Sequence, residues 1–140
     1  MKKRQLFIGV IIILALMSSA TAPATAMTLK ASNYISVYEA TLSRTGADDV
    51  LVSYYVAAPQ ISDQLGVSGI IIERRSGSSW VTAATYSSSN YPAFMGNNCT
   101  THSGTLTYDG VSGMEYRAKV TFFAKKGSGT DSRIFTTNSI

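Results

Sequence analysis

The 140-residue sequence contains one cysteine, one histidine and one tryptophan. Because Cys99 has no second cysteine to pair with, no disulfide can form within one chain, and the fold depends on its hydrophobic core. A catalytic triad would have to use His102, yet no nucleophile-elbow sequence surrounds any serine. Cys99 and His102 at C-x-x-H spacing supply only two of the four ligands of a structural zinc site. We therefore expect no catalytic residue, no metal and no cofactor.

Basic residues exceed acidic ones by 12 to 8, but three of the basic residues lie at the start of the chain, at positions 2–4. An apolar run follows over residues 6–17, and Ala24-Thr25-Ala26 has the small-x-small pattern of a cleavage site. This arrangement predicts a signal peptide over residues 1–26 and a secreted, extracellular protein, with association with the cell surface as an open alternative. The apolar run is too short to span a bilayer, so we expect no membrane contact after cleavage.

The chain without its first 26 residues has nine basic and eight acidic residues. Surfaces that follow nucleic-acid phosphates need clustered lysine and arginine in excess, so a nucleic-acid partner is not expected. The length of residues 27–140 suits a single domain with its own core.

Residues 27–140 are rich in Ser, Thr, Tyr, Val and Ile, without helical periodicity, and glycine recurs at a spacing typical of all-β folds. We expect a seven-stranded, immunoglobulin-like antiparallel β-sandwich. The predicted strands are 34–43, 50–57, 69–75, 80–86, 104–108, 115–125 and 132–137.

Residues 115–125 show the clearest alternation. The even-numbered residues are apolar or small and the odd-numbered ones are polar, with Phe123 as the exception, so one face is expected to be buried and the other wet. In the third predicted strand, Glu73 is expected on the wet face. We therefore predict that Glu73 lies beside Arg117 and Lys119.

The segment YRAKVTFFAKKGSG, residues 116–129, resembles the F strand and F–G turn of fibronectin type III domains. The segment IIIERRSGSSWVTAATY resembles their C–C′ hairpin. This resemblance implies that Tyr116 is a tyrosine-corner residue, with a buried ring and a hydroxyl bonded to nearby backbone. Residues 111–115 depart from the family pattern because they lack its customary proline.

As a whole, the chain resembles an uncharacterised family of small exported proteins from Gram-positive bacteria, on the stretches SGSSW, YRAKVTF and TDSRIFTTNS. That resemblance implies a bacterial source and an exported location. It implies no activity, because a shared fold does not define a function.

Residues 87–103 show no strand alternation and predict a long loop. Alternating strand direction places this loop at the same end as the connection 59–68 and the turn 125–131. Three loops at one end form the kind of surface that antibodies use, so we expect a partner-binding site there with the aromatic residues as anchors. Its expected residues are Asp63, Gln64, Tyr91, Phe94, Met95, Asn97, Asn98, His102, Lys125 and Lys126.

The alternative for this loop is a structural role. Residues 91–95 fold back as a plug over the open end of the sandwich and bury Phe94 and Met95 in the core. The plug would make these two residues structural rather than functional.

The sequence thus favours a monomeric, non-catalytic binding or adhesion module whose partner is an extracellular protein or glycan. A self-assembling subunit that pairs through its first and last strands is the alternative. A dimer linked through Cys99 and a His102-dependent hydrolase complete the alternatives.

Overall fold

In the computed structural model, which describes residues 32–140, all of the strands pair in antiparallel fashion, as expected for an all-β protein. The predicted signal peptide, residues 1–26, lies outside the described residues. The elements are β1 (Val37–Arg44), β2 (Asp49–Ser76), β3 (Ser79–Ser87), the 3₁₀ helix η1 (Pro92–Phe94), β4 (Met95–Asp109), β5 (Tyr116–Lys126) and β6 (Gly129–Thr136).

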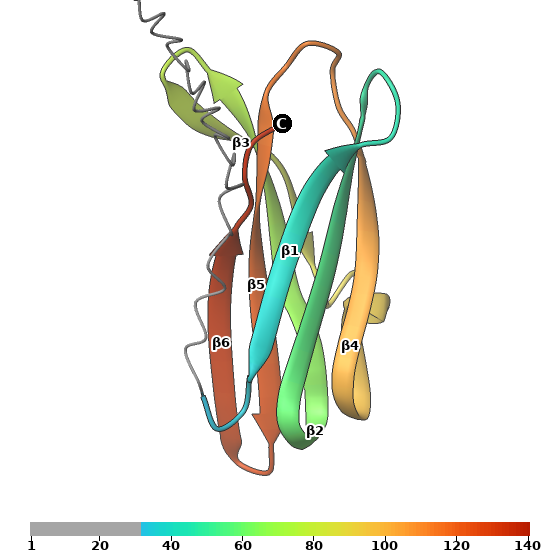
Figure 1. The fold of residues 1–140 in the computed structure, drawn as a ribbon, viewed down its shortest axis with the longest axis vertical. Helices are drawn as coiled ribbons and strands as arrows, with labels where there is room; N and C mark the ends of the chain where they lie inside the picture. Colours follow the sequence, from blue (N-terminus) through green and yellow to red (C-terminus); the bar gives the residue numbers. More distant parts are fainter. Residues whose placement is uncertain (1–31) are drawn as a thin grey trace, which may run out of the picture.

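β2 takes part in both halves of the fold. Residues 50–57 pair with β1 and β4, whereas residues 64–74 pair with β5 and residues 69–76 pair with β3. Figure 1 shows β2 turning at its lower end and running back, so that the sheet curls over on itself. Pro59, which has no N–H to donate to a neighbouring strand, lies in this turn.

β4 follows the same turn beside β2. Its residues 95–99 pair with residues 62–66 of β2, and its residues 101–109 pair with residues 49–57. The two strands stay paired on both sides of the turn, as their neighbouring bends in Figure 1 show. We call this two-stranded turn, residues 57–66 of β2 and 95–101 of β4, the corner.

The local sequence accounts for the corner. Residues 58–61 of β2 stand against a single residue of β4, so β2 takes the longer outer path. Asn98 of β4 has a left-handed φ of 50°, a conformation that asparagine adopts more readily than most residues. Leu65 is fully buried and lies opposite Gly96 on one side and Ala124 on the other, and both of these neighbours are small.

Residues 32–140 form six strands where seven were predicted, because the predicted strands 50–57 and 69–75 are parts of β2. The expected loop over residues 59–68 is therefore wrong, since these residues are extended. Along β2 the buried apolar residues have even numbers from Val50 to Ala58, odd numbers at Leu65 and Val67, and even numbers again at Ile70 and Ile72. Simple alternation cannot reveal a strand whose buried face shifts in this way.

The expected loop over residues 87–103 is also wrong for most of its length. Ser87 ends β3, residues 92–94 form η1, and β4 begins at Met95. β4 pairs with β2 only, and most of its side chains are exposed or half-exposed. Its strand conformation is fixed by backbone pairing rather than by an apolar face, so the sequence shows no alternation.

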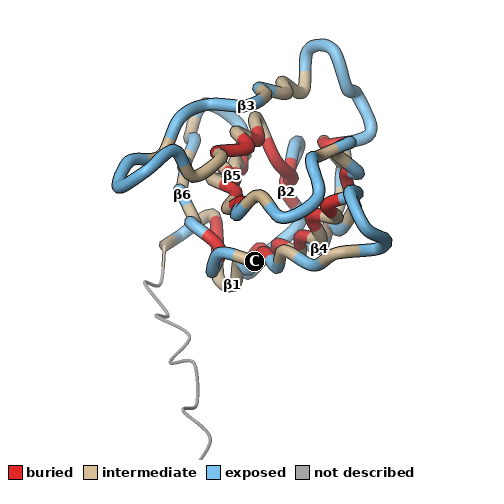
Figure 2. The backbone as a smooth tube through the Cα atoms, turned by 90° about the horizontal axis from the view of Figure 1, so that it is seen from above, coloured by how far each residue is buried: buried red, intermediate tan, exposed pale blue. Residues whose placement is uncertain are grey.

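The core lies between the two halves of the curled sheet, and the buried positions in Figure 2 gather on the inner sides of the strands. The even-numbered residues of β5 from Tyr116 to Ala124 are all fully buried, as their alternation predicted. Within residues 32–140, four buried aromatic residues add bulk to this core: Tyr54, Phe94, Tyr116 and Phe122. Tyr38 of β1 packs its ring against Phe122 at 5.5 Å between ring centres.

The buried ring and the backbone hydrogen bond that were expected of Tyr116 are both present. Its side chain is fully buried, and its hydroxyl accepts a hydrogen bond of 2.9 Å from the backbone N–H of Val111. The ring also meets Tyr108 edge to face, with 5.7 Å between the ring centres. The backbone of Tyr116 exchanges two hydrogen bonds with Ile140, which ties the last residue of the chain to the start of β5.

We predict that Tyr116→Phe destabilises the protein by about 1–3 kcal/mol, because the N–H of Val111 loses its acceptor while the ring stays in place. Urea denaturation followed by circular dichroism measures this change. Tyr108→Phe is the matched control, since the Tyr108 hydroxyl makes no hydrogen bond within residues 32–140. Equal losses in the two variants would show that the Val111 bond is unimportant.

Candidate functional site

The outer surface of the corner brings three of the predicted site residues into one row. Gln64 of β2 lies opposite Asn97 of β4 on one side and Lys125 of β5 on the other. Directly opposed residues of paired strands point to the same face of a sheet, so the three side chains are neighbours. Residues that are distant in sequence therefore meet here, on paired strands rather than on the expected loops.

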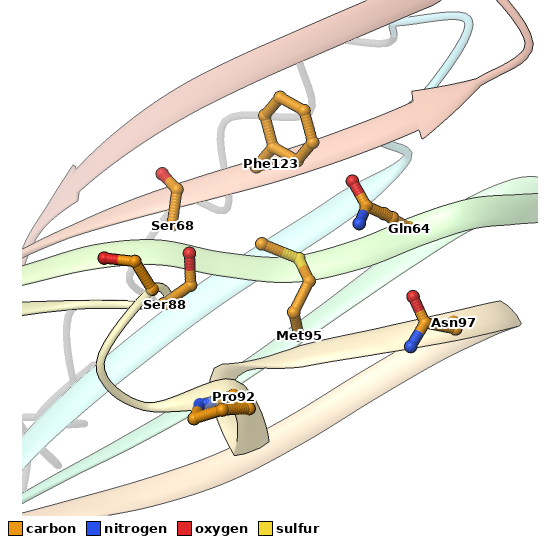
Figure 3. Close-up of a pocket in the computed structure, with 8 residues that line it drawn as sticks. Gln64, Ser68, Ser88, Pro92, Met95, Asn97 and Phe123 are labelled. Carbon is orange, nitrogen blue, oxygen red and sulfur yellow. The ribbon is translucent and has the colours of Figure 1, made fainter.

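The adjacent row contains Gly66 with Met95 on one side and Phe123 on the other. Because Gly66 has no side chain, no side chain of β2 rises above the sheet at this position. A depression of about 450 Å³ lies here (Figure 3). In Figure 3, Met95 lies between Gln64 and Ser88. The depression is lined by Gln64, Ser68, Ser88, Ser89, Pro92, Met95, Asn97 and Phe123.

Gly66 is required by the close approach of the chain between η1 and β4. A Cβ at this position would overlap the carbonyl oxygen of Phe94 and would lie 2.9 Å from Met95 Cα. A hydrogen bond of 3.0 Å from the Ser88 N–H to the Ser68 carbonyl closes the other side of the depression. The shape of the depression is thus set by backbone contacts.

The turn between β5 and β6 lies beside the bend of β2, at the same end of the molecule (Figure 1). Asp63 Oδ2 accepts a 2.7 Å hydrogen bond from the Gly127 N–H, and Lys126 Nζ donates a 2.8 Å hydrogen bond to Gln60 Oε1. Asp63 and Lys126 therefore hold the two segments together. Asn98 lies within the corner and is exposed.

Phe94 does not have the expected exposed position. It is only 4% exposed and meets the buried Tyr54 ring edge to face, so the anchor prediction for Phe94 is wrong and the plug alternative is confirmed for this residue. Tyr91 is 42% exposed and stacks on Phe94, with 5.3 Å between the ring centres. Met95 is half-buried and faces the depression. Within residues 91–95, Phe94 thus belongs to the core, Tyr91 is exposed, and Met95 lines the depression.

His102 lies within β4 rather than in a loop. Its Nε2 is 3.0 Å from the carbonyl oxygen of Ala93, and its ring packs near that of Tyr54. A Cβ on Gly96 would lie 2.8 Å from both Cys99 Sγ and His102 Nδ1, so both side chains lie close to Gly96. Among residues 32–140, no group of three or more metal-ligating side chains is suitably placed to hold a metal ion.

Phe123 was not among the predicted site residues, although the sequence contained a signal for it. It is the one apolar residue on the wet face of β5, and it lines the depression. Ile61 was also missed: it is 59% exposed in the bend of β2. Residues 59–68, which include Ile61, were expected to form a loop. A loop prediction does not indicate which side chains are exposed.

A second polar cluster lies on the outer face of β2, β3 and β5. Glu73 Oε2 and Oε1 bind Arg117 Nε at 2.5 Å and Lys119 Nζ at 3.0 Å, which confirms the predicted pairing. The Arg117 guanidinium also lies over the Trp80 ring, 4.4 Å from its centre. The two cations share one carboxylate, so the cluster keeps a net positive charge although both cations are paired within the molecule.

Comparisons with protein-family models, with curated proteins and with solved structures found no match. Within the described part of the chain, no helix has both the length and the apolar character needed to cross a membrane.

The Glu73 cluster predicts a pH-dependent stability. Burial raises the pKa of Glu73, but its hydrogen bonds to Lys119 and Arg117 and their charges outweigh this effect, so the pKa lies below its ordinary value. A lowered folded-state pKa stabilises the protein above the unfolded-state pKa, and this contribution is lost as the pH falls through the folded-state value. We expect Glu73→Gln to lower the Tm at pH 7, with a difference that shrinks below roughly pH 4.

Thermal unfolding monitored at several pH values tests this expectation. Glu39→Gln is the control, because Glu39 is exposed on β1 and makes no ion pair within residues 32–140. A Tm difference for Glu73→Gln that stayed constant from neutral to acidic pH would contradict the role assigned to the ionised carboxylate.

The different positions of Phe94 and Tyr91 predict different stability losses. Phe94→Ala removes a buried ring and should destabilise the protein by about 3–5 kcal/mol. Tyr91→Ala removes a partly exposed ring and should cost about 1 kcal/mol. Urea denaturation of both variants gives the two values, and a small loss for Phe94→Ala would restore its reading as an exposed anchor.

Proposed function

We propose that the protein is an exported, non-catalytic binding or adhesion module that contacts an extracellular or cell-envelope partner with the corner end of its fold. The corner end comprises the corner and the turn between β5 and β6. The observation that carries this proposal is the gathering of β2, β4 and the β5–β6 turn at one end, next to a depression on the outer surface. Surfaces built from several segments on a rigid scaffold commonly bind partners.

The proposal includes an immunoglobulin-like fold of the fibronectin type III kind. The pairing supports it: β1, the first part of β2 and β4 would form one layer, and β3, the second part of β2, β5 and β6 the other. In this arrangement β2 supplies two of the seven strands. The Tyr116 hydroxyl bond to Val111 adds the contact expected of a tyrosine corner.

Three features support an extracellular partner for the corner end. The first 26 residues have the pattern of a signal peptide, and the remaining residues have almost balanced charge. The corner end itself presents Ile61, which is 59% exposed, and the exposed Lys125 and Asn98. An apolar residue surrounded by polar ones is a common composition for a protein or glycan contact.

Co-sedimentation of the purified protein with isolated Gram-positive cell walls and with mucin-type glycoprotein tests this function. We expect saturable binding that persists at high salt, because the corner end has little net charge. The double variant Ile61→Ser, Lys125→Ser should lose most of this binding. Val111→Ser is the matched control, since Val111 is 53% exposed and follows β4 at the opposite end of the strands.

Absence of binding to either material would overturn the proposal. Equal binding by the double variant and the control would place the contact away from the corner end.

Assembly through edge strands is the second candidate, because β1 and β6 stand at the two ends of the strand order β1-β2-β5-β6 and, within residues 32–140, each pairs on one side only. Sedimentation velocity over a range of protein concentrations tests it. Reversible growth beyond the monomer that is blocked by a proline in β6 would favour assembly over binding.

A further inference from the structure

The depression at the corner is uncharged along its whole lining. Two carboxamides, Gln64 and Asn97, and three serine hydroxyls provide its polar groups, and Phe123 provides an aromatic ring. Lys125 lies in the same row as Gln64 but does not line the depression. A ligand with many hydroxyl groups and no charge matches this lining better than an anionic polymer does.

The two carboxamides have unused hydrogen-bonding capacity. Within residues 32–140, the side-chain amides of Gln64 and Asn97 make no hydrogen bond, whereas the nearby Gln60 accepts one from Lys126. Each amide offers two donors and one carbonyl acceptor. A sugar hydroxyl both donates and accepts, so two adjacent amides can bind neighbouring hydroxyls of one sugar ring.

Phe123 supplies the apolar contact that such a ligand also needs. It is half-exposed, and it lies across Gly66 from Met95, so no side chain of the central strand stands between them. The carbon-bound hydrogens on one face of a pyranose ring can pack on an aromatic ring, while the hydroxyls at its edge point toward polar groups.

We infer that the depression is a subsite for one or two units of a neutral glycan, with Phe123 as the stacking platform and Gln64 and Asn97 as hydrogen-bonding residues. This inference rests on the proposed function and names the class of its partner. Binding at this subsite is expected to be insensitive to salt, because no ion pair contributes to it.

Two-dimensional ¹H–¹⁵N NMR titrations of the purified protein test the inference. The probes are neutral tetrasaccharides of N-acetylglucosamine, glucose, mannose and galactose, with tetragalacturonate as an anionic probe. We expect at least one neutral probe to shift the side-chain amide signals of Gln64 and Asn97 and the backbone signal of Gly66, with tetragalacturonate inactive. Failure of every neutral probe to shift these signals, or an equal response to tetragalacturonate, would overturn the inference.

Three variants distinguish a glycan subsite from an apolar protein contact. Phe123→Leu keeps an apolar side chain without a ring and should weaken the binding of the active tetrasaccharide roughly tenfold. Gln64→Met removes the amide at similar length and should have an effect of the same order. Ile134→Ala is the matched control, because Ile134 is 68% exposed and pairs with Thr121 outside the depression.

The outcomes separate this inference from the proposed function. Cell-wall binding that is lost in Ile61→Ser, Lys125→Ser but retained in full by Phe123→Leu and Gln64→Met would overturn the glycan subsite and leave the proposed function standing. Absence of cell-wall and mucin binding by the unaltered protein would reject the proposed function itself. Binding that is weakened by Phe123→Leu and Gln64→Met but not by Ile134→Ala supports both.

Discussion

The rest of the structure depends on the corner in which β2 and β4 turn together. A strand that passes from one half of a fold to the other tends to lose its neighbouring strands at the turn. Backbone N–H and C=O groups that are buried without a hydrogen-bond partner destabilise the fold. Here β4 remains paired with β2 before and after the turn. The buried Leu65 fills the inside of the corner, and Asn98 adopts the left-handed conformation that β4 needs on its shorter path.

The corner also determines what the surface can do. It brings the start of β4 across Gly66, where a larger residue would collide with the Phe94 carbonyl, and this contact fixes the depression and the position of Met95. It also places Gln64 between residues of β4 and β5 that are far away in the sequence. The hydrogen bonds of Asp63 and Lys126 then hold the β5–β6 turn against the bend of β2. The candidate binding surface is therefore as rigid as the backbone pairing beneath it.

Much of the fold could be predicted from the sequence wherever one face of a strand is buried. The alternation in β5, the pairing of Glu73 with Arg117 and the buried Tyr116 all follow from side-chain patterns, and the structure confirms them. The continuous β2 could not be predicted, because its buried positions change phase twice. The first change lies in the bend between Ala57 and Leu65, and the second lies around Ser68, where a bulge interrupts the pairing of β2 with β5. The sequence predicted the strand 104–108, which is part of β4, but residues 95–103 of β4 could not be predicted, because their pairing uses backbone groups and their side chains are mostly polar. The sequence predicted that Gln64 and Asn97 lie close together, but on loops rather than on paired strands. Phe123 is conspicuous in the sequence as an apolar residue on a polar face, but its place in the depression follows only from the register between β5 and β2.

The most direct test of this account is whether Leu65 is paired on both sides at once. Backbone nuclear Overhauser effects in the isotopically labelled protein would report its distances to Gly96 of β4 and to Ala124 of β5. The account predicts cross-strand signals from Leu65 to both residues, because it lies opposite each of them in the corner. Signals to Ala124 without any to Gly96 would mean that β4 does not follow β2 through the turn, and the corner, the depression and the binding surface built on them would all be contradicted.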